Sequence, residues 1–211
     1  MQYVAEEIKR DIVKYAKLSA AMGLTPNTQG NLSARDRNTG YIAVTPHDLS
    51  YDIMTADDIV VVDIDGKFVD GRLEQSSETP VHCAVYRARP DVMAVVHSEP
   101  VYTNCFGALG MPIEPVVVAL VVDIGGSVPV MPFMPSGSDK FGELMVEVMG
   151  DRKGVIWGNH GLLTIGPDLD HAFRRTVIIE NAAQIYYLTF GVGRKPTLIS
   201  KGMLDPHKPI A

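Results

Sequence analysis

The sequence predicts one compact domain that combines α-helices with β-strands. Apolar residues recur at helical spacing in several stretches, and valine-rich runs bounded by glycine, proline or aspartate lie between them. The chain has 211 residues, of which 46% are hydrophobic, which is enough to bury one large core. No internal repeat or domain boundary interrupts the pattern. We therefore expect residues 1–211 to form a single α/β domain.

The first third of the chain reads as a helix followed by two hairpins. Residues 3–22 carry apolar side chains at helical spacing, and Gly23 provides a helix stop. A turn-rich segment then leads to strands over residues 32–35 and 41–44. After an irregular polar segment, a valine run, an Asp-Gly turn and a second strand predict another hairpin within residues 59–71.

The rest of the chain alternates helices and strands. Between Pro112 and Pro135, prolines, two glycines and valine runs indicate a strand and loops that cross the sheet. Residues 194–211 show no period, and we expect a surface strap or a loosely ordered tail. Helices are predicted over 79–88, 102–109, 137–149 and 169–190, and strands over 92–97, 154–157 and 161–165.

Composition argues against several classes of protein. No apolar run approaches about 18 residues and no charged-then-apolar leader begins the chain, so we expect neither a membrane span nor a signal peptide. A net charge of -6 argues against a nucleic-acid surface. Cys83 and Cys105 lack a CxxC spacing, which argues against a disulfide framework or a cysteine metal site. These features predict a soluble, cytoplasmic protein.

Four side chains at the ends of predicted elements indicate a divalent metal site. His97 and Glu99 are two residues apart at the end of an apolar strand, so an extended backbone directs both to one face. His160 lies in a glycine-flanked turn, and Glu78 lies at a helix start. Imidazole nitrogen and carboxylate oxygen both suit Zn or Mn. The structural alternatives are hydrogen-bonded histidines, a solvated strand end for Glu99 and a helix-dipole interaction for Glu78.

Two short segments have the composition of an anion site. Ser76-Ser77 precedes a helix start, where unpaired N–H groups attract phosphate. Gly30-Asn31 lies in a turn whose exposed N–H groups are able to cradle an anion. A helix cap and an ordinary turn are the structural alternatives. His82 follows Glu78 by four residues on the same helix face, where we expect a structural hydrogen bond.

Taken together, these motifs resemble the class II aldolase and adducin family, and most closely its L-fuculose-phosphate aldolases. The likeness covers the chain from the first helix to about Gly191, with the motifs in order. It implies a central, mainly antiparallel sheet flanked by helices, and a homotetramer with active sites at subunit interfaces. The motifs are GNLS from residue 30, SSE at 76–78, VVH at 95–97, GG at 125–126 and NHGLLTIG at 159–166.

The resemblance also implies a reaction. Such a lyase cleaves a ketose 1-phosphate to dihydroxyacetone phosphate and a small aldehyde, using one divalent metal per subunit, with Zn expected first and Mn or Fe as alternatives. Glu78 matches the catalytic acid/base and metal ligand, while His97 and His160 match metal-binding histidines. Gly30-Asn31 and Ser76-Ser77 match substrate-phosphate contacts.

Three positions depart from the family pattern. Glu99 stands where the family has the second histidine of His-x-His, which shifts the metal preference toward Mn or Fe, or leaves no metal. His47 stands in TPHD, where these aldolases have a small residue and glycine beside the phosphate. Ala119 occupies the place of a tyrosine, and no tyrosine follows Tyr187, so the proton donor to the aldehyde is unassigned.

Three other functions stay open at this point. An L-ribulose-5-phosphate 4-epimerase shares the fold and metal, but such enzymes usually carry aspartate at the position of Glu78. A sugar-acid phosphate decarboxylase is the second alternative. The third is an adducin-like scaffold without chemistry, which missing ligands would favour. The presence of Glu78, His97 and His160 argues against the scaffold, and glutamate rather than aspartate at position 78 favours the aldolase over the epimerase.

Overall fold

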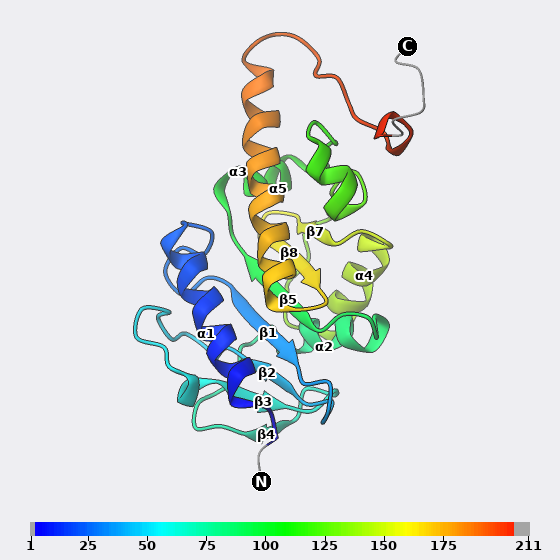
Figure 1. Cartoon of the computed structure of the whole chain (residues 1–211). Helices are drawn as coiled ribbons and strands as arrows, with labels where there is room; N and C mark the ends of the chain where they lie inside the picture. Colours follow the sequence, from blue (N-terminus) through cyan, green and yellow to red (C-terminus); the bar gives the residue numbers. More distant parts are fainter. Residues whose placement is uncertain (1–2, 205–211) are drawn as a thin grey trace.

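A computed structural model describes residues 3–204 and shows an eight-stranded sheet packed between helices (Figure 1). The strand order is β4-β3-β2-β1-β5-β8-β7-β6, and every neighbouring pair is antiparallel except β6 with β7. The predicted α/β class and mainly antiparallel sheet are therefore confirmed. Within the described residues, no helix is both long and apolar enough to cross a membrane.

The elements follow the predicted order closely, with boundaries that differ by up to three residues at most ends. They are α1 (Glu6–Ala21), β1 (Asn31–Arg35), β2 (Ile42–Val44), η1 (Ala56–Asp58), β3 (Val60–Val62), β4 (Phe68–Asp70), α2 (Thr79–Ala88), β5 (Ala94–Ser98), α3 (Val101–Leu109), η2 (Leu120–Ile124), β6 (Val130–Met131), α4 (Asp139–Met149), β7 (Gly154–Trp157), β8 (Gly161–Gly166), α5 (Leu169–Phe190) and η3 (Lys201–Leu204).

Helices cover both faces of the sheet. On one face, α2 and α4 pack against alternate side chains of the central strands, among them Val95 and Leu163. On the other face, α1, α3 and α5 pack against the intervening side chains, including Val96 and Leu162. Because successive strand residues point to opposite faces, His97 lies on the same face as Val95, toward α2 and α4.

The segment between Pro112 and Pro135 differs in part from the expectation. A strand is present, but it is the two-residue β6, which pairs in parallel with β7 at the sheet edge. The valine run before it forms a π-helical turn, η2, in which the carbonyl of Leu120 accepts the N–H groups of Gly125 and Gly126. Burial of one apolar face against α5 overrides the strand preference of valine.

The chain after α5 turns back toward the body of the protein (Figure 1). The N–H of Ile199 donates to the carbonyl of Pro115, and η3 follows at residues 201–204. The described part of the predicted tail thus includes a short helical turn and a contact with the body. Residues 205–211, which belong to the same predicted tail, lie outside the described residues.

Candidate metal centre

The polar residues singled out from the sequence meet at one end of the central strands. Asn31, at the start of β1, lies directly opposite His97 in β5, and His160 lies in the turn between β7 and β8. Glu78 reaches the same point from the start of α2. A pocket of about 150 Å³ is lined by all eight predicted site residues and by His47; the eight are Gly30, Asn31, Ser76, Ser77, Glu78, His97, Glu99 and His160.

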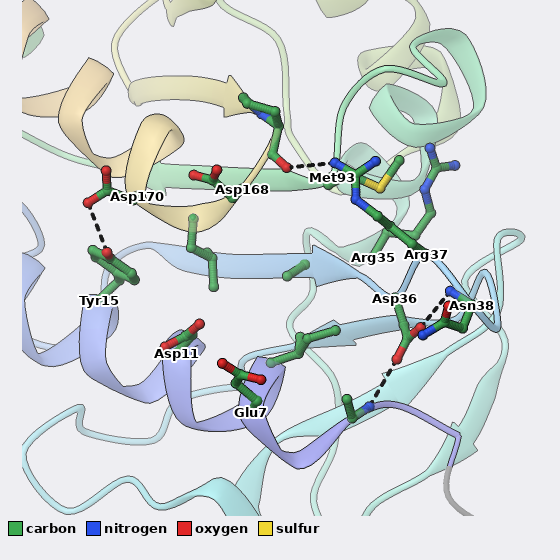
Figure 2. Close-up of a pocket in the computed structure, with 15 residues that line it drawn as sticks. Glu7, Asp11, Tyr15, Arg35, Asp36, Arg37, Asn38, Met93, Asp168 and Asp170 are labelled. Atoms are coloured by element: carbon green, nitrogen blue, oxygen red, sulfur yellow. Dashed lines mark hydrogen bonds between the residues drawn. The ribbon is translucent and has the colours of Figure 1, made fainter.

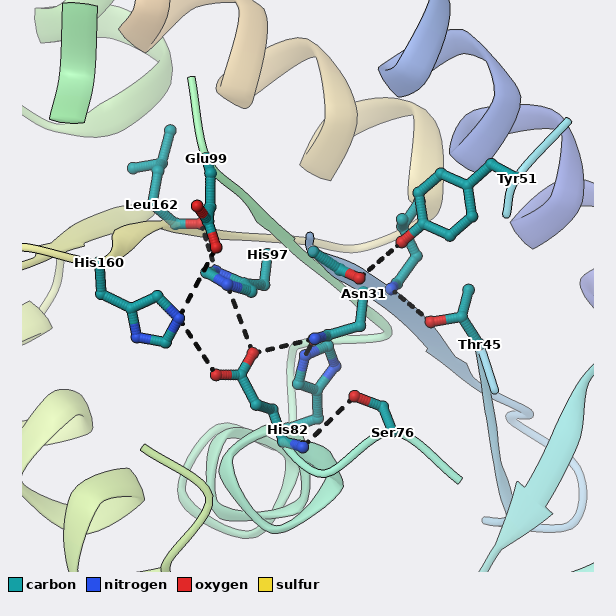
Figure 3. A network of polar contacts seen from close by, with 12 residues as sticks. Asn31, Thr45, Tyr51, Ser76, His82, His97, Glu99, His160 and Leu162 are labelled. Carbon is teal, nitrogen blue, oxygen red and sulfur yellow. Dashed lines mark hydrogen bonds and ion pairs between the residues drawn. The ribbon is translucent and has the colours of Figure 1, made fainter. Parts of the chain in front are cut away.

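Nitrogen and oxygen atoms of three of these residues converge closely. His97 Nε2 lies 3.3 Å from Glu78 Oε2, and His160 Nε2 lies 3.4 Å from Glu78 Oε1. One such atom from each of the three residues lies within 4.8 Å of the others. Glu99 stands beside this cluster, with its Oε1 3.9 Å from His160 Nε2 (Figure 3). This is the convergence expected of a ligand set.

The tautomer of His97 fits a cation at this point. Its Nδ1 lies 3.1 Å from the carbonyl oxygen of Leu162, a group that only accepts, so Nδ1 carries the hydrogen and Nε2 presents a lone pair to Glu78. Burial lowers the pKa of His97, although the nearby Glu78 charge opposes the shift. An imidazole nitrogen and a carboxylate oxygen that face each other across 3.3 Å form a donor set that suits a divalent metal.

Glu78 is turned into the pocket rather than used as a helix cap. Among the described residues its side chain accepts no N–H of its own helix; instead Oε2 accepts from Asn31 Nδ2 at 2.9 Å. Burial favours a raised pKa, but His97 and the hydrogen bonds from Asn31 and Ser136 prevail and hold the pKa of Glu78 below its ordinary value. The group is therefore a carboxylate at neutral pH. Burial raises the pKa of Glu99.

The aromatic ring of Trp157 fixes both histidines. It stacks on His97 with ring centroids 4.2 Å apart and an interplanar angle of 18°. It also meets His160 edge to face at 5.1 Å. Trp157 was not singled out from the sequence, because a tryptophan in an apolar strand is ordinarily core. Its position shows that the same core side chain also orients the two imidazoles.

Two glycines allow the backbone to come close enough to form the site. A Cβ on Gly161 would lie 2.6 Å from the carbonyl oxygen of Ser98 and 2.7 Å from Cε1 of His97. A Cβ on Gly30, whose φ is +119°, would lie 2.8 Å from the carbonyl oxygen of His97. Contacts this short do not occur in proteins, so any other residue at either position would displace His97.

A hydrogen-bonded chain stands behind Glu78. The expected structural hydrogen bond of His82 exists, but its partner is Asn31, whose Oδ1 lies 2.6 Å from His82 Nε2. On the other side, His82 Nδ1 lies 2.7 Å from Ser33 Oγ, which in turn lies 2.8 Å from Tyr86 OH. Spacing along the chain gave no sign of these pairs, because they join β1 to α2.

A larger cavity lies elsewhere and does not contain this cluster. It has a volume of about 440 Å³ and opens between α1, the end of β1 and the start of α5 (Figure 2). Several of its polar side chains are already engaged: Tyr15 donates to Asp170 at 3.0 Å, and Arg37 donates to the carbonyl of Pro167 at 3.2 Å. Size alone therefore does not locate the functional site; convergence of ligand atoms does.

Comparison with known proteins gives one consistent result. Residues 10–187 match the family model described as class II aldolase and adducin N-terminal domain. The 5-deoxy-D-ribulose 1-phosphate aldolase of Bacillus thuringiensis serovar kurstaki is 33% identical over 197 residues, which cover 93% of this chain and 92% of that protein. The L-ribulose-5-phosphate 4-epimerase of Salmonella paratyphi A is 29% identical and covers 90% of each chain.

A solved structure agrees with the sequence comparisons. An L-fuculose 1-phosphate aldolase superposes with a TM-score of 0.90 at 29% sequence identity, covering 95% of this chain and 93% of its own.

Proposed function

This chain belongs to the class II aldolase and adducin family, and from that premise we propose that it is a metal-dependent sugar-phosphate aldolase. It reversibly cleaves a ketose 1-phosphate similar to L-fuculose 1-phosphate, giving dihydroxyacetone phosphate and a small aldehyde. The observation that carries the proposal is the convergence of Glu78, His97 and His160 in one pocket, with atoms within 4.8 Å of one another. Two free cysteines without a partner suit the reducing cytosol in which we place it.

Glu78, His97, Glu99 and His160 would hold the divalent ion, with zinc proposed first and manganese or iron as alternatives. When bound, the ion supplies a Lewis acid that stabilises negative charge on the sugar oxygens as the C3–C4 bond breaks. The remaining work falls to the protein. Glu78, a carboxylate at neutral pH, moves the proton at the carbon atom of dihydroxyacetone phosphate that was joined to the aldehyde.

The substrate phosphate is proposed to bind at the other side of the pocket. Ser76-Ser77 precedes the first turn of α2, and Gly30-Asn31 opens β1, and both segments line the pocket together with Thr28 and His47. N–H groups at a helix start favour a negative charge. Ser76 Oγ also accepts the N–H of Glu78 at 3.3 Å, which ties the phosphate segment to the proposed acid/base.

We also propose a homotetramer with active sites at the subunit interfaces. Several large apolar side chains are exposed, and surfaces of this kind are usually covered by a partner. Phe133 belongs to this set, and its backbone N lies 2.9 Å from where a Cβ on Gly158 would stand, two residues before His160. Phe133 therefore lies near the turn that carries His160. The exposed apolar side chains comprise Val101, Leu109, Val118, Val122, Phe133, Leu188 and Phe190. Sedimentation velocity gives the subunit number directly.

A coupled assay for dihydroxyacetone phosphate with a panel of ketose 1-phosphates tests the reaction. Release of dihydroxyacetone phosphate together with an aldehyde supports the proposal. Conversion of L-ribulose 5-phosphate to its epimer without aldehyde supports the second candidate, which the 29% identity to an epimerase favours. Loss of carbon dioxide from a sugar-acid phosphate identifies a decarboxylase. A chain that binds no divalent metal and turns over none of these substrates is a scaffold.

Glu99 is proposed as a metal ligand in place of an imidazole, and Glu99→Gln tests this. We expect the affinity for Mn²⁺ to fall by about 10-fold or more, because the substitution removes a charge beside the cluster and even outer partners of a metal contribute that much. Titration calorimetry measures the dissociation constant. Glu143→Gln, on the exposed face of α4, is the matched control. Unchanged Mn²⁺ affinity in Glu99→Gln would place this carboxylate outside the coordination shell.

A further inference from the structure

A continuous line of hydrogen bonds runs from the protein core to Glu78. It passes from Tyr86 through Ser33, His82 and Asn31 to the carboxylate, with steps of 2.8, 2.7, 2.6 and 2.9 Å (Figure 3 shows the last part). All five side chains are buried, and Ser33 and His82 are completely so. Such a chain has few alternative arrangements, because water cannot replace a missing partner.

The chemistry of each group determines which atom donates and which accepts in each of these hydrogen bonds. The carboxylate of Glu78 only accepts, so Asn31 must present its NH₂ group there and its Oδ1 to His82. His82 Nε2 therefore carries the hydrogen. Burial lowers the pKa of His82 to about 3, so the ring is neutral and has one N–H only.

The donors and acceptors of the two remaining hydrogen bonds follow from the single N–H of His82. With its N–H used on Asn31, His82 has a lone pair at Nδ1, which accepts from the hydroxyl of Ser33. The Ser33 oxygen then accepts from Tyr86 OH. Along this line each donor meets an acceptor, so the Asn31 amide is held from both ends, by Glu78 in the pocket and by His82 behind it.

We propose that His82 is a positioning residue, whose Nε2–H holds the Asn31 amide in the orientation that turns its NH₂ group toward Glu78. Without this donor, the buried Oδ1 of Asn31 has no partner, and the amide is able to rotate away from Glu78. Glu78 then loses its hydrogen bond and swings away from His97 and His160. The effect on turnover rests on the aldolase function proposed above, whereas the effects on the hydrogen-bond pattern and on cation binding do not.

Two amide substitutions at His82 distinguish a hydrogen-bond donor to Asn31 from a side chain that only fills space in the core. In His82→Gln the side-chain NH₂ group reaches roughly the place of the imidazole Nε2 and is able to donate to Asn31. In His82→Asn the shorter side chain reaches only the place of Nδ1, beside Ser33. Both variants remove the ring and leave a neutral amide, so differences between them report the donor to Asn31.

Mn²⁺ affinity and steady-state kinetics of the full-length chain are the first measurements. We expect His82→Asn to weaken Mn²⁺ binding by about 10-fold or more and to lower kcat by more than it raises KM, as for other partners behind a metal ligand. His82→Gln should stay within about 3-fold of the wild type in both. Equal impairment of the two variants, or no impairment in either, would overturn the proposal.

The tautomer of His82 is measured in the wild-type protein and needs no variant to fold. Heteronuclear NMR of ¹⁵N-labelled histidine should show one neutral ring with its hydrogen on Nε2, unchanged between about pH 5 and 9 given its lowered pKa. A hydrogen on Nδ1 of this ring would overturn the proposal. If wild-type protein has the expected tautomer and Mn²⁺ response but cleaves no ketose phosphate, the aldolase proposal fails and the positioning role stands.

Discussion

Glu78→Gln lowers kcat for aldol cleavage by about a thousandfold or more, since general acid-base catalysis alone contributes about 10²- to 10⁴-fold. The amide is nearly the same shape, so Asn31 and the surrounding helix start stay in place. It has no negative charge, however, and it does not take up a proton at neutral pH. Both the proton transfer and part of the attraction for the cation are therefore lost.

The measurement is kcat and KM in the coupled assay at saturating Mn²⁺ or Zn²⁺, which separates proton transfer from weaker metal binding. Glu143→Gln, on the exposed face of α4, makes the same chemical change far from the pocket and should match the wild type. Thermal unfolding confirms that both variants are folded. A general base contributes about 10²- to 10⁴-fold to the rate. If Glu78→Gln kept more than about a tenth of the wild-type kcat, Glu78 would therefore not be the catalytic base.

Loss of His97 is the second large expected effect. His97→Ala should reduce bound divalent metal from about one equivalent to less than about a tenth, since a site of this kind needs its full set of ligands. In the wild type, a chelator should abolish turnover, and added Zn²⁺ or Mn²⁺ should restore it. In His97→Ala the added ion should restore nothing, because the nitrogen that faces Glu78 is gone.

Elemental analysis of protein purified without chelator gives the metal content. The matched control is His171→Ala, because His171 also belongs to a histidine–carboxylate cluster, with Asp168 and Asp170, but an exposed one. Asp168 there caps α5 by accepting the N–H of His171 at 2.8 Å, so we expect no metal to be lost. A His97→Ala protein that keeps full metal content would contradict the proposed ligand set. Removing the ring also uncovers Trp157, so thermal unfolding accompanies the measurement.

The sequence by itself determined the elements and the candidates. Apolar periodicity located the helices and most strands, because each buries one face whose spacing is visible along the chain. His97, Glu99 and His160 could be singled out because each is a polar group next to an apolar strand, and Glu78 because it begins a helix. The antiparallel sheet was predicted only from the resemblance to a family, because the spacing of residues along the chain does not show which strands pair.

Only the tertiary structure decided which groups meet and how they are oriented. Register places Asn31 of β1 opposite His97 of β5, and packing of α2 on the sheet brings His82 to Asn31. The valine run at η2 likewise became helical through contacts with α5. The physical reason is the same in each case: burial of the whole core sets register and helix position, and a hydrogen bond across elements depends on those positions rather than on distance along the chain.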